Sequence, residues 1–399
     1  MEKTGVDASI CQQRFYYLDW LKVFAIFMVF IFHNTHFFDF VDWSVKNNTQ
    51  SFGMMLVFFL IHFWSMPLFF LLAGAGTKFA LEYKTGAQYL KERVKRLIVP
   101  LFVGMLLLAP PQGYVENLSK FNFQGSFVDY YPYFFKHLSC VFSLKAFGDN
   151  TYHLWFLGFL FVFSIIALPA FLGLKSEFAQ KIISSIASFC EKRGVIFLFA
   201  IPVLILHLVL RVNFPEYSGW ADFFYWFTYF IYGFVIFSNP KFEQAINRHC
   251  KAALIVGMLC IFSVFVMFLM GFGVEGIATP DYSLQSIIFM TIYSLLTWSW
   301  IIFLLSLGRR VLNFSNKFLR YSSEAVLPFY LLHQTIILII GFFVVQWNAC
   351  IIAKFLFISS TSLIATIGIY DLCVRRINFI RVLFGMKLRK RSPQLVTLS

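Results

Sequence analysis

The chain has 399 residues, of which 59% are hydrophobic and only 13% are charged, and phenylalanine alone occurs 55 times. An ordinary soluble domain carries about 25% charged residues, so this composition indicates a polytopic membrane protein. The formal net charge of +14 at pH 7 is explained by topology, because Lys and Arg gather in cytoplasmic loops. We therefore predict no nucleic-acid partner.

Apolar runs long enough to cross a bilayer, which takes about 20 helical residues, recur along the chain with short polar breaks. They predict an all-α fold: a polytopic bundle of about ten transmembrane helices. One membrane domain, 18–373, follows a cytoplasmic N-terminal segment, 1–17, and precedes a basic cytoplasmic tail, 374–399. The expected spans are 18–38, 53–77, 96–112, 152–173, 194–211, 220–238, 251–271, 284–308, 325–346 and 350–373.

The charge distribution predicts the orientation of these spans. With the N-terminus inside, the inner segments hold 26 Lys and Arg residues and the outer segments hold five. This bias favours both termini in the cytoplasm and an even number of spans. The first apolar run lacks a small-x-small cleavage pattern, so we expect no cleavable signal peptide. The seven cysteines are scattered without a C-x-x-C pair, which indicates neither a disulfide framework nor a zinc site.

The first span, "DWLKVFAIFMVFIFHN", contains Asp19, Lys22 and His33. Charged side chains near a bilayer centre cost roughly 2.5 to 3.5 kcal/mol each. Lys22 and His33 are eleven residues apart, close to three helical turns and about 16.5 Å of rise, so they share one face. Asp19 can pair with Lys22 across one turn. The alternative is that Asp19 and Lys22 only snorkel to the interface and that His33 is a hydrogen-bonded core residue.

A second polar cluster, "LKERVKRLIVP", lies where the chain enters the third span, and it contains Arg93 and Arg96 at i and i+3. Two guanidinium groups on one face suit a phosphate-rich ligand, because each planar guanidinium can donate two parallel hydrogen bonds to phosphate oxygens. The alternative is a positive-inside anchor.

Further ionisable side chains lie inside the expected spans, and such residues are functional candidates by default. Each one singly can also be a satisfied packing residue, and His207, near an outer helix end, is the weakest candidate. His36, three residues after His33, lacks a third metal ligand, so we predict no metal site. Tyr330 and His333 are one turn apart and are expected to share a polar face with Glu324. The candidates are His62, His153, His207, Glu324, Tyr330 and His333.

Together these motifs resemble the membrane acyltransferase family 3, and within it the glucans biosynthesis protein C-like branch. The resemblance rests on Lys22 followed by His33, on Arg93-Val94-Lys95-Arg96, and on the segments "FYYLDWLK", "HFWSMPLFFLLAG", "HLWFLGFL" and "PFYLLHQ", in that order, over about 14–375. Lys22 stands where arginine is commoner in the family, and Ala73 where serine is frequent.

The resemblance implies an enzyme that moves a succinyl or acetyl group from cytoplasmic acyl-CoA to a hydroxyl of a periplasmic or cell-surface glycan. His33 would act as general base or nucleophile, with Lys22 and Asp19 at the cytoplasmic mouth and Arg93 and Arg96 on the donor phosphates. His62, His153, Tyr330, His333 and Glu324 would support the acceptor side. No bound cofactor is expected. The partners are acyl-CoA, a glycan and the lipid bilayer, in a bacterial cytoplasmic (inner) membrane.

The alternative class is a multi-pass transporter or flippase of a glycan or lipid-linked precursor. Transporters often carry inverted repeats with broken helices at corresponding positions, and the sequence shows no such pair.

The outer segment 113–151 is expected to be a long loop that contacts the glycan. Inside it, the aromatic stretch 127–143 is interrupted by polar residues and proline, so we assign it to an interfacial or partly re-entrant element. Aromatic side chains can stack on sugar rings, although interfacial belts have the same composition. The candidate contacts are Tyr114, Lys120, Tyr130, Tyr131, Tyr133, Lys136 and Lys145.

Overall fold

The structure, a computed structural model, describes residues 15–138, 143–272 and 279–389, and every regular element within these ranges is a helix. Eight helical segments are long and apolar enough to cross a membrane. The prediction of an all-α membrane bundle is therefore confirmed. The eight are α1 (Tyr16–Thr35), α2 (Phe52–Tyr83), the run α3 (Gly86–Arg93), η1 (Val94–Ile98), α4 (Val99–Leu107) and α5 (Ala109–Lys120), the run α7 (Leu144–Thr151), η2 (Tyr152–Leu154) and α8 (Trp155–Gly173), α13 (Cys250–Leu269), α15 (Leu284–Val311), α16 (Lys317–Val344), and α17 (Ile351–Ile369) with η5 (Tyr370–Val374).

Two of the ten expected spans take a less regular form. The expected span 220–238 corresponds to α11 (Trp220–Ile236), which is followed after a bend of 108° by α12 (Pro240–Arg248). The expected span 194–211 is a shorter apolar helix made of η3 (Val195–Phe199), α10 (Ala200–Leu206) and η4 (His207–Arg211). The remaining helices of the described residues are α6 (Phe127–Lys136), α9 (Glu177–Cys190) and α18 (Asn378–Leu383).

Helix extends beyond the expected third span, 96–112, into the outer segment 113–151, which is largely helical rather than an irregular loop. Helix continues through Lys120, because the two prolines after Ala109 occupy the first turn of α5, where no backbone donor is required. Helices α6 and α7 cover much of the remainder. At ten residues α6 is too short to span a bilayer. The last part of the predicted interfacial stretch, 139–142, lies outside the described residues.

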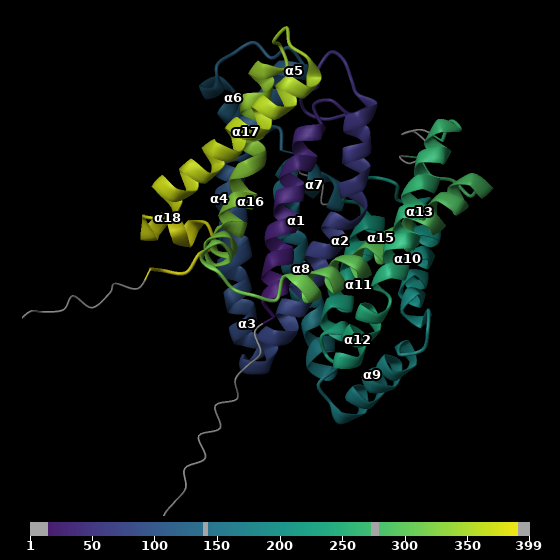
Figure 1. The fold of residues 1–399 in the computed structure, drawn as a ribbon. Coiled ribbons are helices and arrows are strands. Elements are labelled where there is room, and N and C mark those ends of the chain that lie inside the picture. Colours follow the sequence, from purple (N-terminus) through teal and green to yellow (C-terminus); the bar gives the residue numbers. More distant parts are fainter. Residues whose placement is uncertain (1–14, 139–142, 273–278, 390–399) are drawn as a thin grey trace, which may run out of the picture.

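Figure 1 places α3, α9 and α12 at one end of the bundle and α5 and α6 at the opposite end. We call these the α3 end and the α5 end. The α3 end gathers three of the Lys- and Arg-rich segments that the positive-inside rule predicts to be cytoplasmic. The α5 end is then the predicted outer end.

Helices α2 and α11 pack backbone against backbone. A Cβ built on Gly74 would lie 1.9 Å from the carbonyl oxygen of Phe230, and one on Gly233 would lie 1.9 Å from that of Leu71. Only glycine fits at either position, as at other close helix crossings in membranes. Helix α1 packs between α2 and α16 (Figure 1), so its polar residues face the interior of the bundle.

Candidate active site

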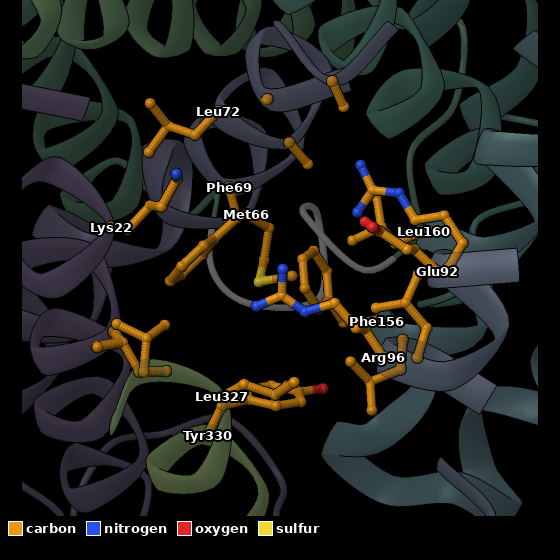
Figure 2. A pocket seen from close by; sticks show the side chains of 18 of the residues that line it. Lys22, Met66, Phe69, Leu72, Glu92, Arg96, Phe156, Leu160, Leu327 and Tyr330 are labelled. Carbon is orange, nitrogen blue, oxygen red and sulfur yellow. The ribbon is translucent and has the colours of Figure 1, made fainter. Parts of the chain in front are cut away.

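A pocket of about 330 Å³ opens among α1, α2, α3 with η1, α8 and α16 (Figure 2). Its wall carries four cationic side chains and one carboxylate, whereas most of its other lining residues are apolar. Figure 2 shows Lys22 and Arg96 reaching into the cavity from facing sides, with the ring of Tyr330 along its wall. We call this the cationic pocket, after Lys22, Lys84, Arg93 and Arg96.

Arg93 is held in place by two neighbours on other turns of the chain. Its guanidinium donates to Thr77 Oγ1 at 2.9 Å and lies over the ring of Tyr89, 4.8 Å from the centroid. Thr77 Oγ1 and the Tyr89 hydroxyl are themselves 3.0 Å apart. Cation–π contact and a hydrogen bond together orient the planar fork. Arg93 is therefore preorganised at the pocket wall, which a simple positive-inside anchor would not require.

Arg96 lies in a π-helical turn. The backbone of η1 closes with a bond from Val99 N to Val94 O, five residues apart, and such π turns are frequent at functional sites. Within the described residues, the Arg96 side chain makes no hydrogen bond or ion pair. The predicted pair Arg93 and Arg96 thus lines one pocket, with Arg96 open to a ligand.

Lys22 enters the pocket from α1 and contacts Asp19 Oδ1 at 3.4 Å, as the i, i+3 spacing predicts. Lys84 is instead paired with Glu92 at 2.5 Å. Among the described residues, Arg93 and Arg96 therefore remain on the pocket wall without an ion pair to a carboxylate. Excess positive charge at the mouth and apolar walls beyond it fit a ligand with a polyanionic head and an uncharged arm.

Three histidines from three helical elements meet beyond the pocket. The ring centroids of His33 and His333 are 5.2 Å apart, and those of His153 and His333 are 5.3 Å apart. We call His33, His153 and His333 the histidine cluster. His33 lies one turn after Val29, which lines the pocket, so the cluster adjoins the inner end of the cavity. Among the described residues, no three His, Cys, Asp or Glu side chains are placed to hold a metal ion.

Hydrogen bonds to backbone carbonyls define two of the three tautomers. A carbonyl only accepts, so His333 Nδ1, 2.7 Å from Tyr330 O, carries a proton, and so does His153 Nε2, 3.1 Å from Leu331 O. The other nitrogen of His333, Nε2, is buried without a partner among the described residues, as is Nδ1 of the neighbouring His33. Buried polar atoms of this kind need an explanation, and here they lie on neighbouring rings that are tilted by 48°.

Tyr330 connects the cationic pocket to the histidine cluster. Its ring lines the pocket, its hydroxyl donates to the backbone carbonyl of His153, and its own carbonyl accepts from His333. His153 directly follows Tyr152, a non-glycine residue with φ 51° and ψ −133°. Backbone strain of this type is concentrated at functional sites, and here it precedes the histidine that contacts both Tyr330 and His333.

Asp39 lies just beyond the outer end of α1, where it contacts two basic side chains. His36 Nδ1 lies 3.0 Å from Asp39 Oδ2, and Lys46 Nζ lies 2.8 Å from Asp39 Oδ1. The Lys46 ammonium also donates to three backbone carbonyls, those of His36, Asp39 and Val41. This network fixes the turn beside the histidine cluster, since the His33 and His36 rings are 6.2 Å apart.

Three predicted candidates belong neither to the lining of the cationic pocket nor to the histidine cluster. Glu324, which the sequence predicts on a polar face with Tyr330 and His333, pairs with Arg381 of the C-terminal segment at 2.6 Å. The ring of His62 stacks on Phe32 and Phe58. His207 is buried and bonds to Ser294 Oγ at 3.0 Å.

Several residues that contact the site residues could not be recognised as such from the sequence. Gln112 Nε2 lies 3.4 Å from His153 Nδ1 and donates to Thr335 Oγ1 at 3.0 Å. The available signal was a polar residue after two prolines in an apolar stretch, "LAPPQG". Thr77 and Tyr89 gave no such signal, because hydroxyl groups are common in membrane helices.

Comparisons with known proteins give one matching family and several related chains. Residues 15–373 match the model of a family described as an acyltransferase domain. A glucans biosynthesis protein C of Salmonella heidelberg (strain SL476) is 22% identical over 354 residues, which cover 84% of this chain and 86% of that protein. A glucans biosynthesis protein C of Shigella dysenteriae serotype 1 (strain Sd197) is 23% identical over 346 residues, 83% and 84% of the two chains. No solved structure gives a significant match.

Proposed function

The chain belongs to the acyltransferase family that it matches over residues 15–373, and from this premise we propose that it transfers an acyl group from acyl-CoA to a glycan hydroxyl across the membrane. The donor binds at the predicted cytoplasmic end and the acceptor at the predicted outer end. The acyl group is succinyl or acetyl, and the acceptor is a periplasmic glucan, in a bacterial cytoplasmic membrane. Membership of this family decides against the transporter or flippase alternative.

The observation that carries the proposal is the adjacency of the cationic pocket to the histidine cluster. Acyl-CoA has phosphates at one end and a neutral pantetheine arm with a thioester at the other. Arg93 and Arg96 suit the phosphates as bidentate donors, and the apolar walls beyond them suit the arm. His33, one turn past Val29 at the inner end of the pocket, then lies at the depth of the thioester.

The reaction needs one base. His33 takes the proton from the acceptor hydroxyl, the hydroxyl oxygen attacks the thioester carbonyl, and the carbon–sulfur bond breaks. The CoA thiolate leaves and is protonated, so the products are an ester and free CoA. General-base catalysis of this kind contributes about 10² to 10⁴-fold.

His333 gives His33 the tautomer that this role requires. The two unpartnered nitrogens, His33 Nδ1 and His333 Nε2, lie on neighbouring rings whose centroids are 5.2 Å apart. A small rotation that lets His33 Nδ1–H donate to His333 Nε2 satisfies both buried atoms. His33 Nε2 then keeps its lone pair for the acceptor hydroxyl. Because Tyr330 O fixes the proton of His333 on Nδ1, His333 can serve only as the acceptor while it is neutral, and it is a positioning residue.

The test is acceptor-dependent release of CoA from labelled acyl-CoA by purified protein and a glycan extract. His33→Ala should abolish acyl transfer while acyl-CoA binding is retained. His207→Ala is the matched control, because it also removes a buried histidine from a membrane helix, away from the pocket. Wild-type protein without acceptor-dependent release would contradict the proposed activity, and an active His33→Ala variant would remove His33 from it.

A further inference from the structure

The C-terminal segment after the last span is fixed against the cationic pocket. Arg381, only 5% exposed, donates from Nε to Lys387 O at 2.9 Å, from one terminal nitrogen to Arg375 O at 3.2 Å and from the other to Glu324 Oε1 at 2.6 Å. One guanidinium thus binds both ends of the segment and α16. We call 375–389 the C-terminal strap.

A glycine brings the strap into contact with the pocket wall. Gly385 has φ +69°, and a Cβ built on it would lie 2.7 Å from Leu327 Cδ2 and 2.9 Å from Arg96 O. Leu327 and Arg96 both line the cationic pocket. The backbone of the strap therefore packs directly behind the π turn that carries Arg96, where no larger residue fits without strain.

Lys387 follows two residues later and is exposed. Its charge acts on Glu92 together with those of Lys84 and Arg96, so Lys387 lies near the mouth of the pocket, where Glu92 is a lining residue. Within the described residues, its ammonium has no hydrogen bond or ion pair, since only its backbone carbonyl is engaged, by Arg381. An exposed cation on a segment held beside the pocket can contact the anionic groups of a ligand that enters there.

We propose that the C-terminal strap is part of the donor site, and that Lys387 contacts the phosphate groups of the bound acyl-CoA. The proposal rests on the proposed function for the identity of the donor. It adds a binding residue more than 290 positions after Arg93 and Arg96, and it gives Arg381 and Gly385 the role of positioning that residue. It also accounts for a buried arginine in a segment that the sequence predicts only to be a basic tail.

The experiment compares Lys387→Gln with Arg376→Gln in steady-state kinetics of acyl transfer. Both residues are exposed cations of the strap, and Arg376 bonds to Asp371 O on the preceding helix. Lys387→Gln should raise KM for acyl-CoA about fivefold with kcat unchanged, as expected for one ionic contact at a solvated mouth. Lys387→Arg should restore KM, and Arg376→Gln should leave it unchanged.

A second donor, acyl-pantetheine, identifies the group that Lys387 contacts, since it has the thioester but no phosphate. The ratio of variant to wild-type KM should return to about one with this donor. An unchanged KM for acyl-CoA in Lys387→Gln, an equal effect of Arg376→Gln, or an equal penalty with both donors would each overturn the proposal. Wild-type protein that transfers nothing from acyl-CoA would instead contradict the proposed function.

Discussion

The cationic pocket and the histidine cluster bring polar side chains into the same bundle under opposite conditions. The pocket is open, and its wall carries the side chains of Lys22, Arg93 and Arg96. In the cluster the rings contact one another at tilted or edge-on angles, and those of His153 and His333 bond to backbone carbonyls. A fixed charge in a membrane needs solvent or a counter-charge, whereas a histidine can be neutral and pack. The difference supports our proposal that the first region binds the ligand and the second transfers the proton.

The largest effect that separates the two regions is expected for His333→Ala. Removal of the proposed acceptor for His33 Nδ1–H leaves the base in either tautomer, so kcat should fall by about 10²-fold or more, while KM for acyl-CoA changes little. Steady-state kinetics with acyl-CoA varied at saturating acceptor measures both. A rise in KM with kcat preserved would instead make His333 part of the donor site.

Arg93→Gln combined with Arg96→Gln should act on the other region. KM for acyl-CoA should rise by about tenfold or more, since each lost charge-assisted contact is worth about 1 kcal/mol or more, and kcat at saturating donor should stay near that of wild type. The matched control is Lys91→Gln with Lys95→Gln, which removes the same charge from the same helical segment outside the pocket lining. If both pairs behave alike, the arginines serve topology rather than binding.

Tyr330→Phe tests the connection between the regions. The change removes only the hydroxyl that donates to His153 O, and one such hydrogen bond is worth about 0.5–1.5 kcal/mol. We expect kcat/KM to fall by about two- to tenfold, mainly through kcat. The affinity for acyl-CoA, measured in the absence of acceptor, should be unchanged. A lower affinity would place the Tyr330 hydroxyl on the donor side.

The last expected effect is on stability rather than on kinetics, and it is a pH dependence of unfolding that arises at the outer wall of the cluster. Burial alone would raise the pKa of Asp39, but the hydrogen bonds and charges of His36 and Lys46 outweigh it and lower that pKa below 3.8. A carboxyl with a depressed pKa contributes stability that is present above its unfolded pKa and lost as pH falls through its folded pKa. Asp39 therefore stabilises the protein at pH 7 and loses this contribution below about pH 4.

Asp39→Asn should lower the melting temperature in detergent at pH 7, by the equivalent of about 1–3 kcal/mol, and should flatten the acid slope. Thermal unfolding followed from pH 3 to pH 7 measures both. Equal acid slopes in the variant and the wild type would show that the acid lability has another source.

The parts of the site that follow helical periodicity could be predicted from the sequence. Lys22 and His33 share the inner face of α1, and Arg93 and Arg96 line one pocket, because spacing along one helix determines which residues share a face. Partners from distant segments could not be predicted. Glu324 pairs with Arg381, and Gln112 bonds to Thr335, and these contacts depend on how α16 packs against its neighbours.

Backbone irregularities also escaped prediction. The π turn at 94–98 and the continuation of helix through Lys120 depend on bundle packing and on prolines that occupy a first helical turn instead of ending a helix. Both change the site, since the first carries Arg96 and the second carries Gln112.

The central claim, that the donor binds at the α3 end and the acceptor reacts from the α5 end, is tested most directly in sealed vesicles that contain the protein in one orientation. Labelled acyl-CoA and glycan are supplied on the same side or on opposite sides of the membrane, and acylated glycan is measured. The account predicts product only when acyl-CoA faces the α3 end and the glycan is on the other side. Product that forms only when both substrates face the same side would contradict it.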